Sequence, residues 1–261
     1  MPTPIDIFMN PVAYTCMAVF AGLIAWERLL PAKRLPYIRY WQLKGLAAFV
    51  FYFLLSSYLP LWWEATLVKY RLFSIAAWPV WTQAIAGLLV YEFLVYWWHR
   101  SMHGSDMLWR MFHQLHHSAE RLDTFGAFWF NPTDMAGFTL MTSLALTLVL
   151  GVNVEAATLV LYVTFFLGIF QHANIRTPRW LGYFVQRPES HSRHHGKGQH
   201  RDNYADLPVF DLLFGTFSNP ASHRDNGFWH GASSRVTDML LWRDVNAEPA
   251  LERELETWSK S

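Results

Sequence analysis

The sequence predicts an all-α integral membrane protein, with four to five transmembrane or re-entrant helices and a helical cap that holds a histidine-rich site. Three observations lead to this fold class. Apolar runs approach 20 residues, which is the length that a helix needs to cross a bilayer. Charged residues make up only 16% of the chain, against about 25% in typical soluble domains. Histidines gather in the polar segments directly beyond the apolar runs.

The composition also excludes several kinds of protein. The formal net charge is +1 and no dense basic tract is present, so we expect no nucleic-acid partner. Cys16 is the single cysteine of the chain and lies inside an apolar run. Disulfides within the chain and cysteine-ligated metal clusters are therefore excluded.

Five apolar runs follow one another along the chain, at residues 12–26, 45–63, about 77–98, 135–150 and 154–171. The first run is short for a full crossing unless it recruits flanking residues. Gly151-Val152-Asn153 reads as the turn of a hairpin between the last two runs. Because its first arm is short, this hairpin at 135–171 is either spanning or re-entrant, and the parity of the crossings is the same in both cases.

Positive charge predicts the orientation of the spans. The segments 28–44, 99–134 and 172–261 carry five, three and eleven Lys or Arg residues and fall on one side of five crossings. The other side has none before residue 28 and two in the link 64–76. Since Lys and Arg are enriched in cytoplasmic loops, we expect the polar histidine segments on the cytoplasmic side.

We divide the single predicted domain into three regions. Residues 1–98 hold the N-terminal transmembrane helices, 99–217 the histidine-rich catalytic region with the membrane hairpin, and 218–261 a cytosolic tail. Within the tail, a short helix is expected near Asp238–Asp244. The apolar segment 207–217 is expected to pack the cap against the bilayer surface, with Asp211 as its anchor.

Three histidine clusters have spacings that suit helices. His99 and His103 are four residues apart, so that on a helix they lie about 40° apart on one face. Gly104-Ser105-Asp106 reads as the end of that helix and the N-cap of the next one. The other two clusters repeat an i, i+3, i+4 pattern: His113, His116 and His117, and then His191, His194 and His195. Three helical faces can thus converge on one volume.

The clusters predict a dinuclear metal site. Imidazole suits zinc, copper, iron and nickel, and eight histidines are too many for one tetrahedral zinc ion. No Glu lies within the clusters, whereas a zinc hydrolase needs a carboxylate beside the metal-bound water. A zinc-dependent membrane hydrolase and a histidine-rich membrane metal-binding or transport protein stay open as alternatives.

The motifs HRSMH, HQLHH and HSRHH, with QHANI, DNY and FDLLFGTF, resemble the fatty acid hydroxylase/sterol desaturase superfamily over roughly residues 85–218. The resemblance implies a membrane-bound, non-haem di-iron oxygenase with two iron ions. It implies that O₂ and an external electron donor serve to hydroxylate, desaturate or oxidatively demethylate a lipid, such as a fatty acyl chain or a sterol-like substrate. It also implies nine metal ligands: His99, His103, His113, His116, His117, His172, His191, His194 and His195.

The remaining expectations concern the surroundings of the metals and the partners. Asp202, Asn203 and Glu92 are the first candidates to orient the metal ligands, followed by Asp206, Asp106 and Glu120. His200, His223 and His230 have no cluster partner and are expected at the surface. The partners expected are a bilayer lipid and a separate donor of the ferredoxin or cytochrome b5 type. The compact chain favours the bacterial inner membrane over the endoplasmic reticulum.

Overall fold

The computed structural model describes residues 2–247, and in that part of the chain the regular elements are all helices. Three helical segments are long and apolar enough to cross a bilayer: α2 (Pro11–Leu29), α3 with α4 (Trp41–Tyr58 and Pro60–Lys69), and α5 (Val80–Gly104). The predicted all-α membrane fold with histidine clusters is therefore confirmed. The membrane association of the chain rests on these three segments.

The apolar runs and the helices agree in position but differ in extent. The run at 135–150 forms α8 (Pro132–Ser143) and the π-helical η3 (Leu144–Val149), and the run at 154–171 forms α9 (Val154–Phe170). Neither has the length of a full span by itself, so the five predicted crossings reduce to three candidate spans plus this hairpin. Asn153 caps α9 by accepting a hydrogen bond from the backbone N–H of Ala156, as expected for the turn that ends at this residue.

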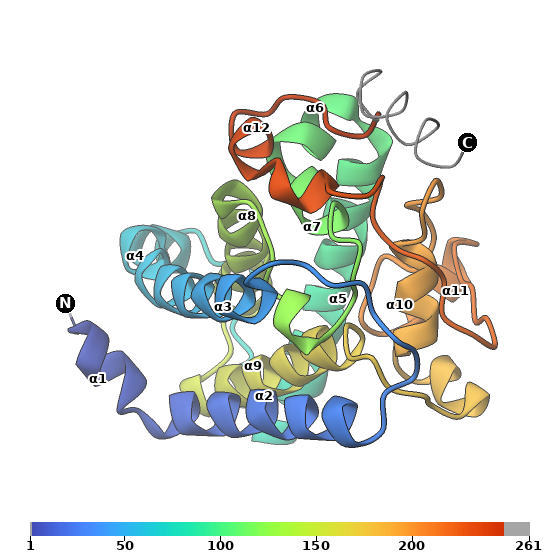
Figure 1. The fold of residues 1–261 in the computed structure, drawn as a ribbon. Coiled ribbons are helices and arrows are strands. Elements are labelled where there is room, and N and C mark those ends of the chain that lie inside the picture. Colours follow the sequence, from blue (N-terminus) through green and yellow to red (C-terminus); the bar gives the residue numbers. More distant parts are fainter. Residues whose placement is uncertain (1, 248–261) are drawn as a thin grey trace, which may run out of the picture.

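Helix α5 is the central element of the fold. In Figure 1 it rises through the middle of the molecule towards α6 (Asp106–Leu108). It packs against α9, which in turn packs against α2, while α3 and α4 pack against α8. Gln83 near the start of α5 fixes the hairpin, because its side chain accepts a hydrogen bond from the backbone of Asn153 at 2.8 Å. The start of α5 is thus tied to the hairpin, and its opposite end carries His99 and His103.

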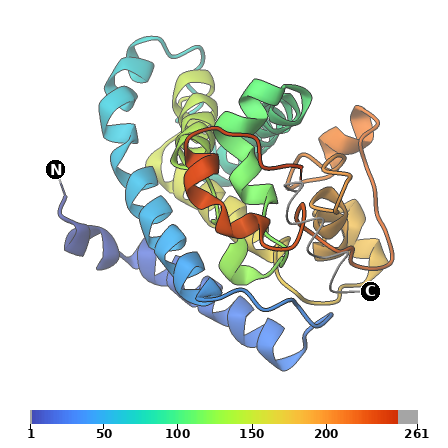
Figure 2. The same ribbon diagram turned by 45° about the horizontal axis from the view of Figure 1, so that its top comes forward.

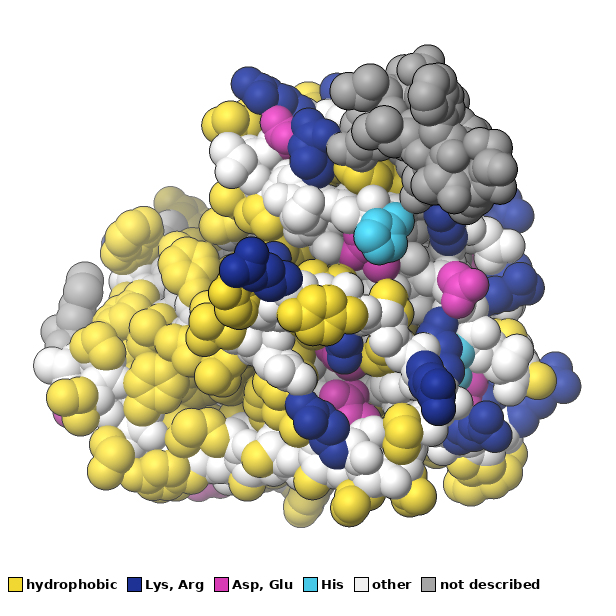
Figure 3. All heavy atoms as spheres, in the orientation of Figure 1, with side chains coloured by type: hydrophobic (Ala, Val, Ile, Leu, Met, Phe, Trp, Pro, Cys, Tyr) yellow, Lys and Arg dark blue, Asp and Glu magenta, His cyan; other side chains and the backbone are white. Residues whose placement is uncertain are grey.

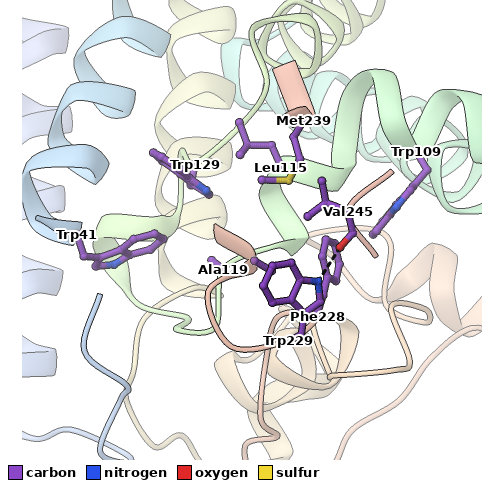
Figure 4. Close-up of a cluster of buried hydrophobic side chains, with 10 residues drawn as sticks. Trp41, Trp109, Leu115, Ala119, Trp129, Phe228, Trp229, Met239 and Val245 are labelled. Carbon is purple, nitrogen blue, oxygen red and sulfur yellow. Dashed lines mark hydrogen bonds between the residues drawn. The ribbon is translucent and has the colours of Figure 1, made fainter. Parts of the chain in front are cut away.

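The cap is built from short elements around its own core. They are η1 (Trp109–His113), α7 (Gln114–His117), η2 (Thr124–Gly126), η4 (Arg179–Tyr183), α10 (Pro188–His194), α11 (Val209–Leu213), η5 (Ala232–Ser234) and α12 (Val236–Leu240). Figure 4 shows the aromatic cluster, in which Trp109 and Trp129 lie with Leu115 and Met239. Figure 2 shows α12 lying over the α7 region, with which it is in contact. The predicted helix near Asp238–Asp244 is real but begins and ends earlier, at Val236 and Leu240.

The surface is divided by polarity. In Figure 3 hydrophobic side chains gather over α3 and α4, while most Lys and Arg side chains lie on the other side and at the top, over the cap. Large apolar residues such as Leu43, Trp62 and Ile85 are exposed on the long helices. Exposure of so much apolar surface is expected where lipid replaces water around the protein.

Close packing of α3 against η2 gives a test of the fold. A Cβ atom added to Gly45 would lie 2.2 Å from the carbonyl oxygen of Phe125, whereas one added to Gly22 on α2 would meet nothing within 4 Å. We expect Gly45→Ala to destabilise the protein by about 1–3 kcal/mol through overpacking. Gly22→Ala should be neutral or stabilising by about 0.5–1 kcal/mol. Thermal unfolding in detergent compares the two, and equal midpoints would contradict this packing.

Candidate metal centre

The three histidine motifs lie on three short helical stretches that face one another. His99 and His103 are in the last turns of α5, which ends at Gly104, and Ser105 then caps α6 as predicted. The second motif follows in η1 and α7, and the third is in α10 and its C-cap residue His195. The structure brings all eight motif histidines together, and His172, at the end of α9, joins them.

The nine histidines form two groups that could each hold a metal ion. The five-histidine group consists of His99, His103, His113, His117 and His194, and the four-histidine group of His116, His172, His191 and His195. Within each group, one ligand atom of every residue lies within 4.8 Å of the others. The clusters thus offer two neighbouring groups of candidate ligands, and the dinuclear site itself stays a prediction.

Each HxxHH motif contributes to both groups. His113 and His117, four residues apart, belong to the five-histidine group, while His116 belongs to the other. The third motif does the reverse, because His191 and His195 stay together and His194 crosses over. On a helix the i+3 and i+4 positions lie about 100° apart, so a helix between two sites can serve both. His116 and His194 each belong to a different group from the other two histidines of their motif, so both helical stretches contribute to both groups.

Hydrogen bonds at Nδ1 fix how most of the imidazoles are protonated. His99 and His194 face the carbonyl oxygens of Tyr204 and Asp202 at 2.8 and 2.6 Å. His172 faces that of Gly168 at 2.6 Å. Since a carbonyl oxygen only accepts, Nδ1 of each ring carries the proton. Nε2 of each ring is therefore left with a lone pair.

The Nε2 atoms converge at distances that suit nitrogen ligands of a shared cation. His99 and His113 approach through Nε2 at 2.8 Å, and His191 lies 3.0 Å from both His172 and His195. The Nε2 atoms of His103, His117 and His194 are buried without a hydrogen-bond partner. Two ligands at right angles, each about 2.1 Å from one ion, stand about 3.0 Å apart. The donor set therefore fits two metal ions bound by imidazole nitrogens.

Burial keeps these histidines neutral. It lowers the pKa of His113, His191 and His194 well below the ordinary value, and the charge of neighbouring imidazolium rings would lower it further. The pKa of His172 falls to about 4 for the same main reason. Neutral imidazole is the form that binds a metal, so at neutral pH these sites are ready to bind without losing protons.

Asp134 holds His113 and was missed in the sequence. Its Oδ2 accepts a hydrogen bond from Nδ1 of His113 at 2.6 Å, and both side chains are buried. A carboxylate on the far nitrogen of a metal-binding histidine orients the ring and raises its basicity. Asp134 lies 21 residues after His113, in the first turn of α8, and its only sequence signal is a carboxylate at the start of an apolar run.

The predicted orienting residues lie near the site but act differently. Asp202 orients His194 with its backbone carbonyl, while its carboxylate pairs with Arg193 at 3.1 Å. The side chain of Asn203 binds the carbonyl oxygens of Ser190 and Ser218, and Glu92 accepts the backbone N–H groups of Asp206 and Leu207. None of these three side chains bonds to a ligand histidine. They hold in place the backbone whose carbonyl oxygens bond to the histidines.

The segment 202–207 is polarised by these contacts. Its carbonyl groups at Asp202 and Tyr204 face histidines, while carboxylates receive its N–H groups. Buried Asp211 accepts from the N–H groups of Tyr204 and Ala205 and so fixes this loop, while its predicted role in packing 207–217 against the bilayer stays a prediction. Asp202 and Asn203 adopt φ values of +70° and +54°, a left-handed conformation that Asp and Asn tolerate best among non-glycine residues.

The other predicted candidates lie away from the ligands. Asp106 is exposed, and Glu120 binds Ser233 and the N–H of Gly231. His230 is exposed as expected, and His223 is half-buried. The surface prediction is wrong for His200, whose Nδ1 lies 3.0 Å from Nδ1 of His117 and whose ring packs against Trp109 and Phe228. Its positive φ of 43° turns the side chain inward, which sequence spacing does not show.

A cavity of about 620 Å³ leads to both groups. Five histidines line it: His99, His113, His116, His172 and His191. Phenylalanines of α3, α8 and α9 form much of the remaining wall. The hydroxyl groups of Thr139 and Thr164 donate to carbonyl oxygens of their own helices, which leaves the wall without free donors there. An apolar chain can therefore extend along the cavity to the histidines.

Comparison with known proteins agrees with this site. A model of the family "Fatty acid hydroxylase" matches residues 84–216. Ornithine lipid hydroxylase OlsE of Rhizobium tropici is 35% identical over 148 residues, which are 55% of this chain and 44% of that protein. Protein CER1-like 2 of Arabidopsis thaliana is 30% identical over 48% of this chain and 22% of its own length. Very-long-chain aldehyde decarbonylase GL1-4 of Oryza sativa subsp. indica is 28% identical over 55% and 26%.

The matches thus span less than half the length of these curated relatives. No solved structure matches the chain at a significant level.

The contact between Asp134 and His113 predicts a change in metal binding. Asp134→Ala removes the acceptor from Nδ1 of His113, so metal affinity should fall about 10- to 100-fold. Asp134→Asn keeps an acceptor oxygen and should recover part of the loss. Asp106→Ala, at an exposed carboxylate, serves as the control. Competition with a chelator measures the affinities, and equal values for the two alanine variants would refute a role for Asp134.

The crossing of the motifs predicts how metal is lost in double variants. His113→Ala with His194→Ala damages only the five-histidine group, so one of two metal ions should remain. His113→Ala with His116→Ala lies within one motif but damages both groups, so both ions should be lost. Elemental analysis of the purified proteins decides this. The reverse order of metal content would mean that each motif serves its own metal.

Proposed function

Because the chain belongs to the fatty acid hydroxylase family, we propose that it is a membrane-bound, non-haem di-iron oxygenase that acts on a lipid. It uses O₂ and electrons from a separate donor to hydroxylate, desaturate or oxidatively demethylate its substrate. The observation that carries the proposal is the convergence of nine histidines, eight of them buried and His103 half-buried, in two groups at the end of an apolar cavity.

The donor set supports two iron ions. Imidazole suits iron, and a group of five histidines exceeds the four ligands of a structural zinc site. Neither group contains a carboxylate in the part of the chain that the structure describes, so a zinc hydrolase would have no general base there. A metal transporter would need ligands along a path, whereas these nine lie at one place. Both alternatives are therefore less well supported.

The chain itself positions the reaction. Bound iron supplies the activation of O₂ that lets an unactivated C–H bond react. The cavity wall holds the lipid chain with one end at His99, His113 and His116 and keeps water away. The Nδ1 contacts of the histidines keep the Nε2 lone pairs directed inward through the catalytic cycle. The same arrangement supports hydroxylation and desaturation.

The substrate enters from the bilayer in this proposal. Helices α2 to α5 contribute residues to the cavity, so an acyl chain can reach the histidines without leaving an apolar environment. The names of the relatives, a hydroxylase of ornithine lipid and a decarbonylase of very-long-chain aldehydes, support a lipid with a long chain. A fatty acyl lipid is the first candidate, and a sterol-like ring is the second.

The orientation and the electron donor are part of the same proposal. The positive charge of 28–44, 99–134 and 172–261 supports a cytoplasmic position for the histidines. The bacterial relative supports the inner membrane of a bacterium. The donor is a separate carrier of the ferredoxin or cytochrome b5 type, docking on the cap.

A reconstituted reaction tests the proposal. Iron-loaded protein, a ferredoxin with its reductase, O₂ and a bacterial lipid extract should give lipids that are heavier by one oxygen atom or lighter by two hydrogen atoms. With ¹⁸O₂ the added oxygen should carry the label. The variants His116→Ala and His194→Ala should be inactive. Product formation by both variants, or zinc in place of iron in active protein, would overturn the mechanism.

Filling the cavity should stop turnover without loss of metal. Gly168 lines the cavity, and an added Cβ atom there meets nothing within 4 Å, so Gly168→Leu extends into the substrate space. Gly22 has equal free space but faces outward on α2, which makes Gly22→Leu the matched control. We expect at least about 10-fold slower turnover for Gly168→Leu only, because the side chain occupies the position of the substrate. Equal rates would show that the lipid binds elsewhere.

A further inference from the structure

A chain of hydrogen-bonding side chains runs from a metal-site histidine to a carboxyl group at the cavity wall. Nδ1 of His191 lies 2.7 Å from the side-chain amide of Gln186, which also contacts the amide of Gln171. The amide of Gln171 in turn lies 2.8 Å from Oδ1 of Asp206. Gln171 and Gln186 are buried, and all four side chains line the cavity.

The donor and acceptor atoms along this chain can be assigned by starting from His191. Its Nε2 faces His172 and His195 at 3.0 Å, so Nε2 provides the lone pair to the four-histidine group. Neutral imidazole carries one proton, which must then be on Nδ1. The atom of Gln186 that faces Nδ1 is therefore its amide oxygen.

The surroundings of Gln186 support this orientation independently. With the oxygen towards His191, the amide nitrogen of Gln186 donates to the carbonyl oxygens of Asn203 and Ala205 at 3.0 and 3.1 Å. In the opposite orientation two carbonyl oxygens would face an amide oxygen, and buried acceptors would have no donor. The orientation of an amide is assigned from its partners, and here both sides agree.

The same reasoning fixes Gln171 and then Asp206. Turned in this way, the oxygen of Gln186 lies 2.5 Å from the amide oxygen of Gln171, so the Gln171 amide must turn by 180° to donate its NH₂ group there. Its amide oxygen then takes the position of its nitrogen, which lies 2.8 Å from Oδ1 of Asp206. Two oxygen atoms at this distance share a proton, since 2.7–2.8 Å is typical of an O–H···O hydrogen bond. An amide oxygen has no proton to give. The proton therefore belongs to Asp206.

The other groups around Asp206 favour its neutral form. Glu92 of α5 lies beside it and accepts the N–H of Asp206 at 2.9 Å, and Tyr91 of α5 and Tyr52 of α3 line the same cavity. A second negative charge beside Glu92 would be repelled. Burial raises the pKa of Asp206 to about 6.

We propose that Asp206 is held as a neutral carboxylic acid at the cavity wall and donates a proton to oxygen during turnover. This rests on the proposed function. Hydroxylation of a C–H bond with O₂, two electrons and two protons gives one C–OH group and one water molecule. The O–O bond breaks, the carrier protein supplies both electrons, and Asp206 and solvent each supply one of the two protons of that water. Its carboxylate then regains a proton from solvent.

Asp206→Asn separates the proton from the hydrogen bond. Asparagine keeps an N–H donor for Gln171 but has no acidic proton. We expect unchanged metal content and unfolding temperature, loss of one carboxylic acid C=O band in the infrared difference spectrum, and turnover about 100-fold slower. The infrared measurement on iron-loaded protein does not depend on activity.

Asp211→Asn is the matched control. Asp211 accepts three hydrogen bonds, from the N–H groups of Tyr204 and Ala205 and from the hydroxyl of Thr216, so it acts only as an acceptor. An amide NH₂ there would face an N–H group, and the variant should unfold at a lower temperature. If Asp206→Asn lowers the unfolding temperature as much as Asp211→Asn does, a neutral Asp206 is contradicted.

The outcomes for the two proposals differ. An infrared band that persists in Asp206→Asn overturns the neutral acid, and full turnover by that variant overturns proton donation. Wild-type protein that converts no lipid contradicts the proposed function instead, while the infrared comparison still decides the state of Asp206.

Discussion

The structure depends on the crowding of nine neutral imidazole rings in one buried volume. Several of their Nε2 atoms approach one another to 2.8–3.0 Å, a spacing that suits cations bound between them. The protein therefore has to hold the rings from behind, through Nδ1. Carbonyl oxygens of Gly168, Asp202 and Tyr204 and the carboxylate of Asp134 do this, and each of them is fixed in turn by helix or loop backbone.

The membrane helices and the histidine site form one continuous structure. Helix α5 is both a candidate span and the source of His99 and His103, so the apolar environment of the bilayer continues directly to the histidines. The low polarity keeps the histidines neutral and makes charged intermediates costly, and in the proposed function it admits a lipid chain. Groups that can move protons are consequently placed at the cavity edge, where Gln171, Gln186 and Asp206 form a polar strip.

The loop 202–207 connects these two parts. Glu92, inside α5, accepts hydrogen bonds from N–H groups of this loop. The carbonyl oxygens of the loop orient histidines from α5 and α10. A carboxylate within a candidate membrane span thus has a structural role: it accepts hydrogen bonds from backbone N–H groups of a loop, which have no partner within a helix. This also places Asp206 beside Glu92, where two negative charges would repel each other and a neutral carboxyl group is favoured.

The sequence alone determined the all-α membrane fold and the eight clustered histidines, because apolar run length and helical spacing are local properties, whereas His172 was added only by the resemblance to the family. It could not decide which histidine joins which group, since i+3 and i+4 positions diverge by about 100° and only the facing helices select between them. It also missed Asp134, Gln186 and the inward turn of His200. These contacts join residues distant in sequence, or use backbone carbonyls, which every residue has and no motif marks.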